Sequence, residues 1–262
     1  MRQTKRFAVV GSDARQAAAG RALARAGYTV GGVQQLPQAD CILLPLPLEQ
    51  ADLPLAQLLG MAKPGALALG GKVTDSARTI ARAAGVELVD YFARPELTVY
   101  NAIPTAEGCI GILLERRSRT LWGAAVLVLG FGRVGRITAQ RFAALGARVS
   151  VAARKYDQLA WAQAMGFDPQ PLSHLAGWLC GYDLVVNTIP APVLTRRELE
   201  DLKPDCLILD LASKPGGVDQ TAAGELGLAV IWALALPGKV APVTAGAAIQ
   251  TAIYNMLQEL GR

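Results

Sequence analysis

The segment Val126-Leu127-Val128-Leu129-Gly130-Phe131-Gly132-Arg133-Val134-Gly135 decides the fold of this 262-residue chain. Its apolar start predicts a buried strand, and the GxGxxG pattern that follows is typical of a turn into a helix. Gly130 would permit the tight turn, Gly132 would let the backbone approach a pyrophosphate, and Gly135 would let helix and strand pack closely. A glycine-rich packing turn is the alternative, but the preceding strand favours dinucleotide binding. The other residues of the predicted phosphate loop are Phe131, Arg133 and Val134.

The next predicted strand indicates which dinucleotide is bound. An NAD site usually has Asp or Glu at the end of that strand, where the carboxylate holds the ribose 2′-hydroxyl. Here the strand leads into Ala153-Arg154-Lys155, and no acid follows before Asp157. A guanidinium can hold a 2′-phosphate with two hydrogen bonds, so Arg154 favours NADP as the cofactor. The alternative is a solvated basic turn.

Strands and helices alternate on both sides of this segment. In the second half, strands are predicted at residues 125–129, 148–152, 184–187, 207–211 and 229–232, with helices at 134–145 and 156–165. In the first half, strands are predicted at residues 6–10, 29–33, 41–44, 66–69 and 86–89, with helices at 13–26 and 74–84. Because parallel strands need crossover connections, the alternation predicts an α/β fold with two Rossmann-like domains built on parallel sheets.

The stretch 91–119 lacks strand periodicity and is predicted to form crossing helices that join the two domains. Pro104 is expected to open the longer helix, because proline suits a first helical turn. A last helix is expected to return to the first domain. The predicted substrate-side domain therefore comprises residues 1–119 plus the C-terminal helix 242–262, and the predicted NADP-binding Rossmann domain comprises residues 120–241.

Other strand ends in the second half are expected to complete the cofactor site. In open parallel sheets, ligands bind at the carboxyl ends of the strands. The residues that follow these strands are Asn187, Thr188, Ile189 and Pro190, together with Asp210. Two further loops, which carry Lys214 and Lys239, are expected at the nicotinamide end, although each alone could be an ordinary loop.

The first half lacks a matching phosphate loop, since only one glycine is present in Gly11-Ser12-Asp13-Ala14-Arg15-Gln16. We therefore expect this domain to bind the substrate, with Asp13, Arg15 and Gln16 at the end of its first strand. Asp13 could instead cap the following helix, and the other two side chains could face solvent.

Composition excludes several classes of protein. A hydrophobic fraction of 52% excludes intrinsic disorder. The net charge of +5 is scattered without a basic aromatic face, so no nucleic-acid partner is expected. The uncharged stretch 240–258 is too polar to span a membrane, and the N-terminus shows no signal peptide, so a cytoplasmic protein is expected.

Cysteine and histidine usage limits the chemistry. The four cysteines form no CxxC pair, so no metal site is expected and buried thiols are predicted. The single histidine, His174, precedes a predicted strand and should lie away from the cofactor. A dehydrogenase that oxidises an alcohol often uses histidine as its general base, so this chain must use Lys, Tyr or a carboxylate, or need little help with proton transfer.

Taken together, these residues resemble the dipicolinate synthase A-subunit family, the dehydrogenase-like component found in spore-forming bacteria. The resemblance covers nearly the whole chain, and its specific motifs are Asn101-Ala102-Ile103-Pro104-Thr105-Ala106-Glu107-Gly108 and Asp210-Leu211-Ala212-Ser213-Lys214-Pro215-Gly216-Gly217. It implies that a dihydrodipicolinate-type intermediate loses a hydride to NADP and a proton, giving dipicolinate. It also implies a partner, the flavoprotein-like B-subunit of dipicolinate synthase, and a location in the mother cell during sporulation; an oligomer is expected.

A dicarboxylate substrate would need paired donors, because an unpaired buried charge is costly. The cations on the predicted ligand-facing loops are Arg15, Lys214 and Lys239. Lys214 and Lys239 are the candidate catalytic residues, since either could accept the proton, although both could instead be solvated loop charges. Further hydrogen bonds to the substrate are expected from Asn101, Thr105, Glu107 and Thr244.

Two alternatives to the dipicolinate synthase function are open. One is an oxidoreductase resembling 2-hydroxyacid dehydrogenases, which the absence of a suitably placed histidine disfavours. The other is a non-catalytic module that senses NADP and regulates a partner. Such a sensor would bind NADP without transferring a hydride.

Overall fold

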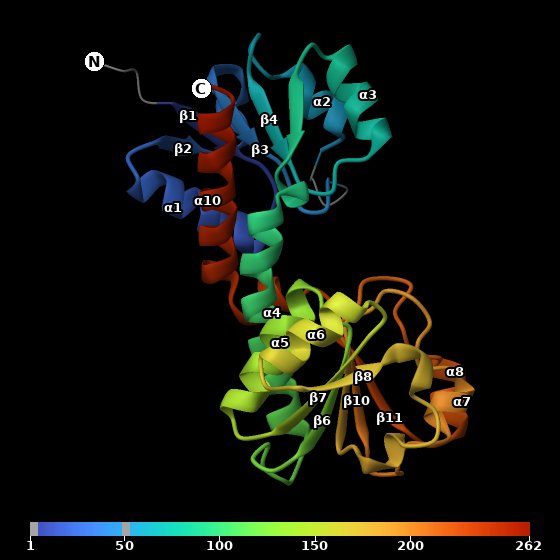
Figure 1. Ribbon diagram of the computed structural model, residues 1–262. Coiled ribbons are helices and arrows are strands. Elements are labelled where there is room, and N and C mark those ends of the chain that lie inside the picture. Colours follow the sequence, from blue (N-terminus) through green and yellow to red (C-terminus); the bar gives the residue numbers. More distant parts are fainter. Residues whose placement is uncertain (1–4, 49–52) are drawn as a thin grey trace. The chain divides into compact units, whose positions relative to one another are not determined.

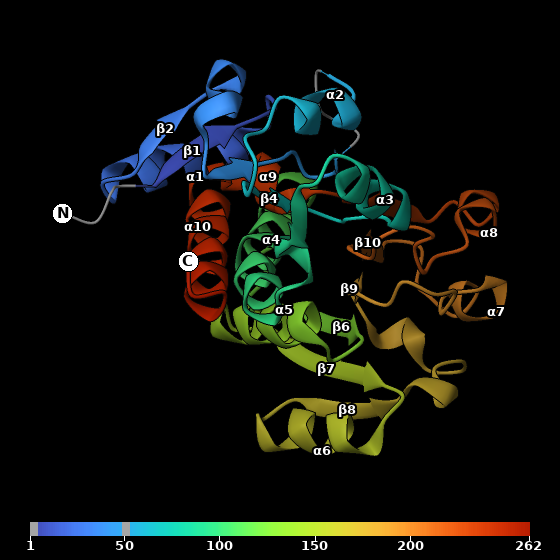
Figure 2. The same cartoon turned by 90° about the horizontal axis from the view of Figure 1, so that it is seen from above.

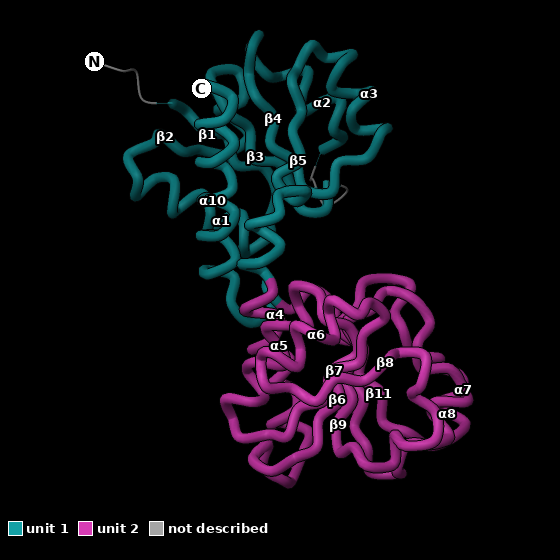
Figure 3. The backbone as a smooth tube through the Cα atoms, in the orientation of Figure 1, with its two compact units in different colours: residues 1–101, 237–262 teal, residues 102–236 magenta. Residues whose placement is uncertain are grey.

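A computed structural model describes residues 5–48 and 53–262 of the chain. The chain forms two compact units, residues 1–101 with 237–262 and residues 102–236 (Figure 3). The first division falls inside helix α4 (Pro95–Arg116) rather than at residue 119. The physical reason is that Cys109 and Leu113, from the second half of α4, are buried in the core of the second unit.

The first unit is a three-layer α/β structure. Its strands are all parallel, in the order β2-β1-β3-β4-β5 (Figures 1 and 2). They are β1 (Arg6–Val9), β2 (Thr29–Gly31), β3 (Cys41–Leu43), β4 (Leu67–Gly70) and β5 (Glu87–Asp90). One face is covered by α1 (Ala14–Arg25) and α10 (Pro242–Glu259), the other by α2 (Leu55–Gly60) and α3 (Asp75–Ala83).

Alternation along each strand supplies both faces of this sheet with apolar side chains. In β1, Phe7 packs in the cluster that contains α1 and α10, and Ala8 packs in the opposite cluster with α2 and α3. This is expected for a parallel sheet, whose crossover helices bury both faces. Apolar side chains of β1 are thus buried on both faces of the sheet.

The second unit repeats the plan with strands in the order β11-β10-β9-β6-β7-β8, again all parallel. They are β6 (Ala125–Leu129), β7 (Arg148–Ala153), β8 (Asp168–Pro171), β9 (Leu184–Asn187), β10 (Leu207–Asp210) and β11 (Ala229–Trp232). One face packs against α4, α5 (Arg133–Ala144) and α6 (Tyr156–Ala164). The other packs against α7 (Arg196–Leu199) and α8 (Gln220–Glu225), and α9 (Leu236–Val240) precedes α10.

The α/β fold with two parallel sheets is as predicted, and three local expectations were wrong or incomplete. Pro104 lies inside α4, and Pro95 occupies its first position. The edge strand β8 was missed because Asp168-Pro169-Gln170-Pro171 has no apolar pattern; an edge position tolerates its prolines. Short helices were also missed: α2, α7, α8, α9 and the 3₁₀ helices Val33–Gln38, Tyr91–Ala93, Leu172–His174 and Leu179–Gly181.

Helix α4 is the one helix among the described residues that is long and apolar enough to cross a membrane. It is a core helix of this fold. Leu97 is buried in the core of the first unit, and Ala106, Cys109 and Leu113 are fully buried further along. Its apolar composition therefore reflects packing against the two sheets.

Helices α1 and α10 approach so closely that only glycine fits at position 246. A Cβ atom on Gly246 would lie 2.5 Å from the Cβ of Ala18 and 2.7 Å from both the Ala19 nitrogen and the Arg15 carbonyl oxygen. These contacts include backbone, which cannot swing aside as a flexible side chain can. Residues 237–262 belong to the first unit, and α10 packs against α1 there through this contact.

We predict that Gly246→Ala destabilises the protein by about 1–3 kcal/mol, since overpacking forces the two helices apart. The matched control is Gly111→Ala, also inside a helix, where an added Cβ meets nothing within 4 Å. That change should be neutral or stabilising by up to about 1 kcal/mol through helix propensity. Urea unfolding of both variants measures the difference, and equal stability of the two would contradict the prediction.

Candidate cofactor and substrate sites

The phosphate loop has the geometry that its glycines predict. Gly130 has φ +94°, a left-handed conformation that favours glycine. A Cβ on Gly135 would lie 2.0 Å from the Gly130 carbonyl oxygen, so helix α5 packs directly on the turn. A Cβ on Gly132 would meet nothing within 4 Å and would point into the open space where a pyrophosphate would bind. The loop therefore fits a dinucleotide.

The start of α5 presents free backbone donors to that space. Gly132 is the N-cap residue and supplies no side-chain cap, so the first N–H groups of α5 can bind phosphate oxygens. Phe131 is buried against Phe167, and the Nε of Arg136 donates to the Phe131 carbonyl at 3.2 Å. Of the other loop residues, Arg133 is exposed and Val134 is half-buried.

The end of β7 carries the predicted nucleotide selector. Ala153 is buried as the last residue of the strand, whereas Arg154 and Lys155 are exposed. Neither cation takes part in an ion pair within the described ranges. Both are thus accessible to an anionic ligand at the carboxyl edge of the sheet.

Asn187 and Asp210, predicted to contact the cofactor, are fully buried and bonded to each other. The Asn187 Nδ2 donates to Asp210 Oδ1 at 2.8 Å, and the Asn187 Oδ1 accepts from the Ile189 nitrogen at 3.0 Å. Asp210 also accepts from the nitrogens of Ala212 and Gly217, at 3.0 and 2.8 Å. Their side chains therefore hold the loops after β9 and β10 in place.

The remaining residues after β9 line the phosphate turn. The Thr188 hydroxyl donates to the Leu129 carbonyl at 2.8 Å, and the Thr188 and Ile189 side chains lie against Gly130. Pro190 is exposed. Lys214 is exposed in the loop after β10, which Asp210 anchors at both ends. Trp232 supports that loop by donating its Nε1 to the Ala212 carbonyl at 2.8 Å.

In the first unit, Asp13 and Arg15 form a partly buried ion pair at the end of β1. The Asp13 carboxylate caps α1 by accepting from the Arg15 nitrogen, and it pairs with the guanidinium at 2.6 Å. The Arg15 hydrogen bond lowers the pKa of Asp13 and the pairing raises the pKa of Arg15. The Arg15 Nη2 also donates to the Leu46 carbonyl at 3.0 Å, while its Nη1 has no partner among the described residues. Arg15 thus keeps two N–H donors for an anion.

Gln16 is fully buried, which contradicts the expectation that it reaches a ligand or solvent. Its Nε2 donates to the Val10 carbonyl at 3.1 Å, which turns its Oε1 toward Gly11, and no partner for that oxygen is found among the described residues. Tyr91, for which the sequence predicted no role, is also fully buried, with its hydroxyl 3.5 Å from the Leu44 carbonyl. Burial raises the pKa of Tyr91, so this phenol stays protonated.

The other predicted substrate residues are dispersed. Glu107 is exposed and pairs with Arg141 near the end of α5 at 3.9 Å, about 12 Å of helix rise from the phosphate loop. Asn101 and Thr105 lie half-buried on α4, in different units. Lys239 and Thr244 are exposed and belong to the first unit, with Gly238 packed against the Arg15 side chain.

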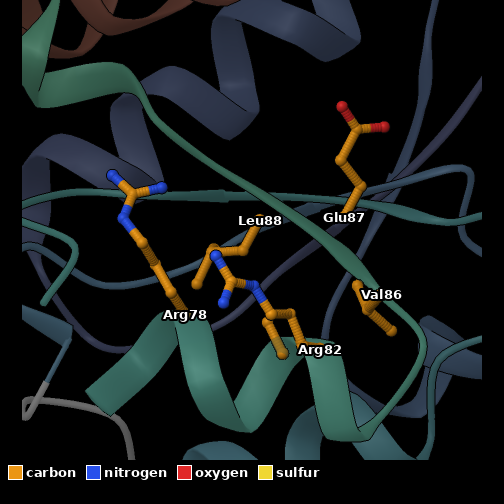
Figure 4. A pocket seen from close by; sticks show the side chains of 6 residues that line it. Arg78, Arg82, Val86, Glu87 and Leu88 are labelled. Atoms are coloured by element: carbon orange, nitrogen blue, oxygen red, sulfur yellow. The ribbon is translucent and has the colours of Figure 1, made fainter. Parts of the chain in front are cut away.

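Several features lie outside these sites. A hollow of about 240 Å³ between α3 and the start of β5 is lined by Arg78, Arg82 and Glu87, at the amino-terminal edge of the sheet (Figure 4). His174 is exposed, and of the four cysteines only Cys180 is exposed. In the part of the chain that the structure describes, no group of three or more acidic, histidine or cysteine side chains could hold a metal ion.

We predict that Gly132→Val leaves the fold intact and abolishes cofactor binding, because the new side chain occupies the pyrophosphate position. The matched variant Gly135→Val should instead destabilise the second unit, since its Cβ collides with the Gly130 carbonyl. Calorimetric titration with the dinucleotide and thermal melting separate the two effects. Unchanged cofactor affinity in a folded Gly132→Val protein would place the cofactor elsewhere.

Comparison with known proteins agrees with this geometry. Residues 112–217 match the family described as D-isomer specific 2-hydroxyacid dehydrogenase, NAD binding domain. The second unit thus contains an NAD(P)-binding dehydrogenase domain, whose matched range includes the phosphate loop and the loop after β10.

Dipicolinate synthase A-subunits match more of the chain, at 31% identity or above. The dipicolinate synthase A-subunit of Bacillus subtilis (strain 168) is 41% identical over 181 residues, which cover 69% of this chain and 61% of that relative's length. The crystal structure of the dipicolinate synthase A-subunit from Bacillus halodurans is 31% identical, with a TM-score of 0.87 and 97% of each chain covered. That of the Bacillus subtilis protein is 32% identical, with a TM-score of 0.86, covering 100% of this chain and 98% of the other. Because it is 31–32% identical to these two structures over at least 97% of each chain, the chain belongs to the dipicolinate synthase A-subunit family.

Proposed function

We propose that this protein is the dehydrogenase subunit of a dipicolinate synthase and oxidises a dihydrodipicolinate-type intermediate to dipicolinate (pyridine-2,6-dicarboxylate). The observation that carries the proposal is a dinucleotide loop in one unit together with a partly buried arginine, Arg15, at the ligand-binding edge of the other. Family membership supports the choice of substrate, since the relatives bear the name dipicolinate synthase.

NADP is the proposed cofactor. Arg154 and Lys155 follow β7 where an NAD-specific enzyme would carry an acid, and both are exposed and outside any ion pair of the described residues. A guanidinium suits the geometry of a 2′-phosphate. When bound, the nicotinamide supplies hydride acceptance, and the protein supplies orientation and charge.

The proposed reaction removes one hydride and one proton from the dihydro ring. The hydride and its electron pair pass to NADP⁺, giving NADPH, and the proton passes to a basic group or to water. Lys214 and Lys239 are the candidate proton acceptors; Lys214 is exposed in the loop after β10, and Lys239 is exposed in the short helix α9. Because aromatisation supplies driving force, the reaction needs a weaker base than the oxidation of a simple alcohol. This accords with a chain whose single histidine, His174, lies outside both sites.

The association of the chain is part of the same proposal. Its relatives are named as one of the subunits of a synthase, which supports a partner, the flavoprotein-like B-subunit. We further propose an oligomer that acts in the cytoplasm of the mother cell during sporulation. The second candidate function is that of a 2-hydroxyacid dehydrogenase, favoured by the match of residues 112–217. The third, an NADP sensor, would use the same loop without turnover.

The cofactor preference is tested with Arg154→Ala. We predict that NADP affinity falls about 10- to 150-fold, as expected for a charge-assisted hydrogen bond worth roughly 1.5–3 kcal/mol, while NAD affinity changes little. Arg148→Ala removes an exposed arginine from the opposite end of the same strand and serves as the control. Calorimetric titration measures all three proteins. Equal losses for NADP and NAD would show that Arg154 does not contact the 2′-phosphate, leaving Lys155 as the next candidate.

The activity is tested by turnover of a dihydrodipicolinate-type substrate with NADP⁺, with and without the flavoprotein-like partner, by following NADPH and dipicolinate. We predict stoichiometric formation of the two products. Arg15→Met should raise the substrate KM at least about 10-fold, since a charged hydrogen bond to a carboxylate is lost, and leave NADP affinity unchanged. A 2-hydroxyacid dehydrogenase would instead turn over hydroxy acids, and a sensor would bind NADP without forming NADPH.

A further inference from the structure

We propose that Lys72 is a further substrate-binding residue, the second cation that holds a carboxylate at the ligand-binding edge of the first unit beside Arg15. The inference rests on the proposed function and names the part of the site that receives the second acid group. The sequence pattern gave no reason to single out Lys72, which follows β4 in the run Gly70-Gly71-Lys72.

The backbone of Lys72 is in a conformation that its side chain disfavours. Its φ of +57° is left-handed, and only one other non-glycine residue of the described chain, Ala235, has a positive φ. Such a residue persists where the surroundings determine it, and these residues gather at ligand sites. A glycine at position 72 would adopt this left-handed conformation without strain, as Gly70 and Gly71 before it could. The presence of a lysine instead indicates that its side chain has a role.

A network of hydrogen bonds imposes this conformation. The Asp90 carboxylate, at the end of β5, accepts hydrogen bonds from the Lys72 nitrogen at 3.2 Å and the Val73 nitrogen at 2.9 Å. The same carboxylate accepts from the Phe92 nitrogen at 2.8 Å. The turn after β4 is therefore fixed to the end of β5, and the direction in which Lys72 leaves the backbone is fixed with it.

The turn lies next to the residues that hold Arg15. A Cβ on Gly71 would lie 2.5 Å from the Leu46 side chain and 3.0 Å from the Tyr91 hydroxyl. The carbonyl of the same Leu46 accepts the hydrogen bond from Arg15. The two cations thus follow β1 and β4, the strands on either side of β3, at one edge of one sheet, and Leu46 in the segment after β3 contacts both turns.

The ammonium group of Lys72 is available for an anion. It is exposed, it lies 5.5 Å from the centre of the Phe92 ring, and it has no ion-pair partner in the described parts of the chain. The ring restrains the side chain without neutralising its charge. Arg15, in contrast, shares its charge with Asp13, so a dianion needs the unpaired charge of Lys72.

The test is calorimetric titration with pyridine-2,6-dicarboxylate and with pyridine-2-carboxylate, at saturating NADP⁺. In Lys72→Met the affinity for the dicarboxylate should fall about 10- to 150-fold, to near that of the monocarboxylate, and Lys72→Arg should restore most of it. The control is Arg82→Met, which removes one exposed charge from α3 of the same unit, in the hollow at the amino-terminal edge (Figure 4). NADP affinity should be unchanged in all variants.

A second variant separates ligand binding from stability. Lys72→Gly relieves the left-handed strain, which offsets the greater backbone entropy of glycine, so its melting temperature should not fall. Its dicarboxylate affinity should fall as in Lys72→Met. If Lys72→Gly keeps the full dicarboxylate affinity and the wild type turns over normally, the proposed role of Lys72 is overturned while the proposed function stands. A wild type that neither binds the dicarboxylate nor forms NADPH would overturn the proposed function and this inference with it.

Discussion

The parallel direction of every strand is the constraint on which both sites depend. Parallel neighbours need a crossover, so each strand starts at one edge of its sheet and ends at the other. The segments after the strands therefore collect at the carboxyl edges. In the second unit they bring the glycine loop, Arg154 and the loop after β10 to one edge of the sheet; in the first they bring Arg15, Leu46 and Lys72 together.

The carboxylates at these strand ends accept hydrogen bonds from the backbone of the adjoining loops and so fix the loop conformations. Asp210 accepts from two backbone nitrogens and an amide, Asp90 from three backbone nitrogens, and Asp13 from the helix that it caps. A carboxylate that accepts several such hydrogen bonds rigidifies the backbone around it. The groups left for ligands are then free N–H groups and cations, which is the donor set that phosphates and carboxylates require.

The sequence was sufficient for the fold and for the cofactor loop, because both depend on local patterns. The apolar runs marked ten of the strands, and the spacing of three glycines placed a turn whose geometry each glycine explains. It was insufficient for β8, whose two prolines hide a strand, and for Gln16 and Glu107. The surroundings of these two side chains depend on tertiary contacts: Gln16 is buried beside Gly11, and Glu107 forms an ion pair with Arg141. Lys72 could not be singled out from the sequence for the same reason, because its left-handed backbone conformation is imposed by Asp90, eighteen residues away along the chain.

The discontinuity of the first unit bears on how the chain is made. Its core needs Ala248, Ile249, Ala252 and Ile253 of α10, packed against Phe7 and Leu23. During synthesis, all of residues 102–236 leave the ribosome before α10 does. The second unit can therefore complete its core first, whereas the first unit then has α1 but not yet α10 over one face of its sheet. Because exposed apolar surface of this kind promotes aggregation, we expect the nascent chain to be most prone to aggregate before α10 emerges from the ribosome.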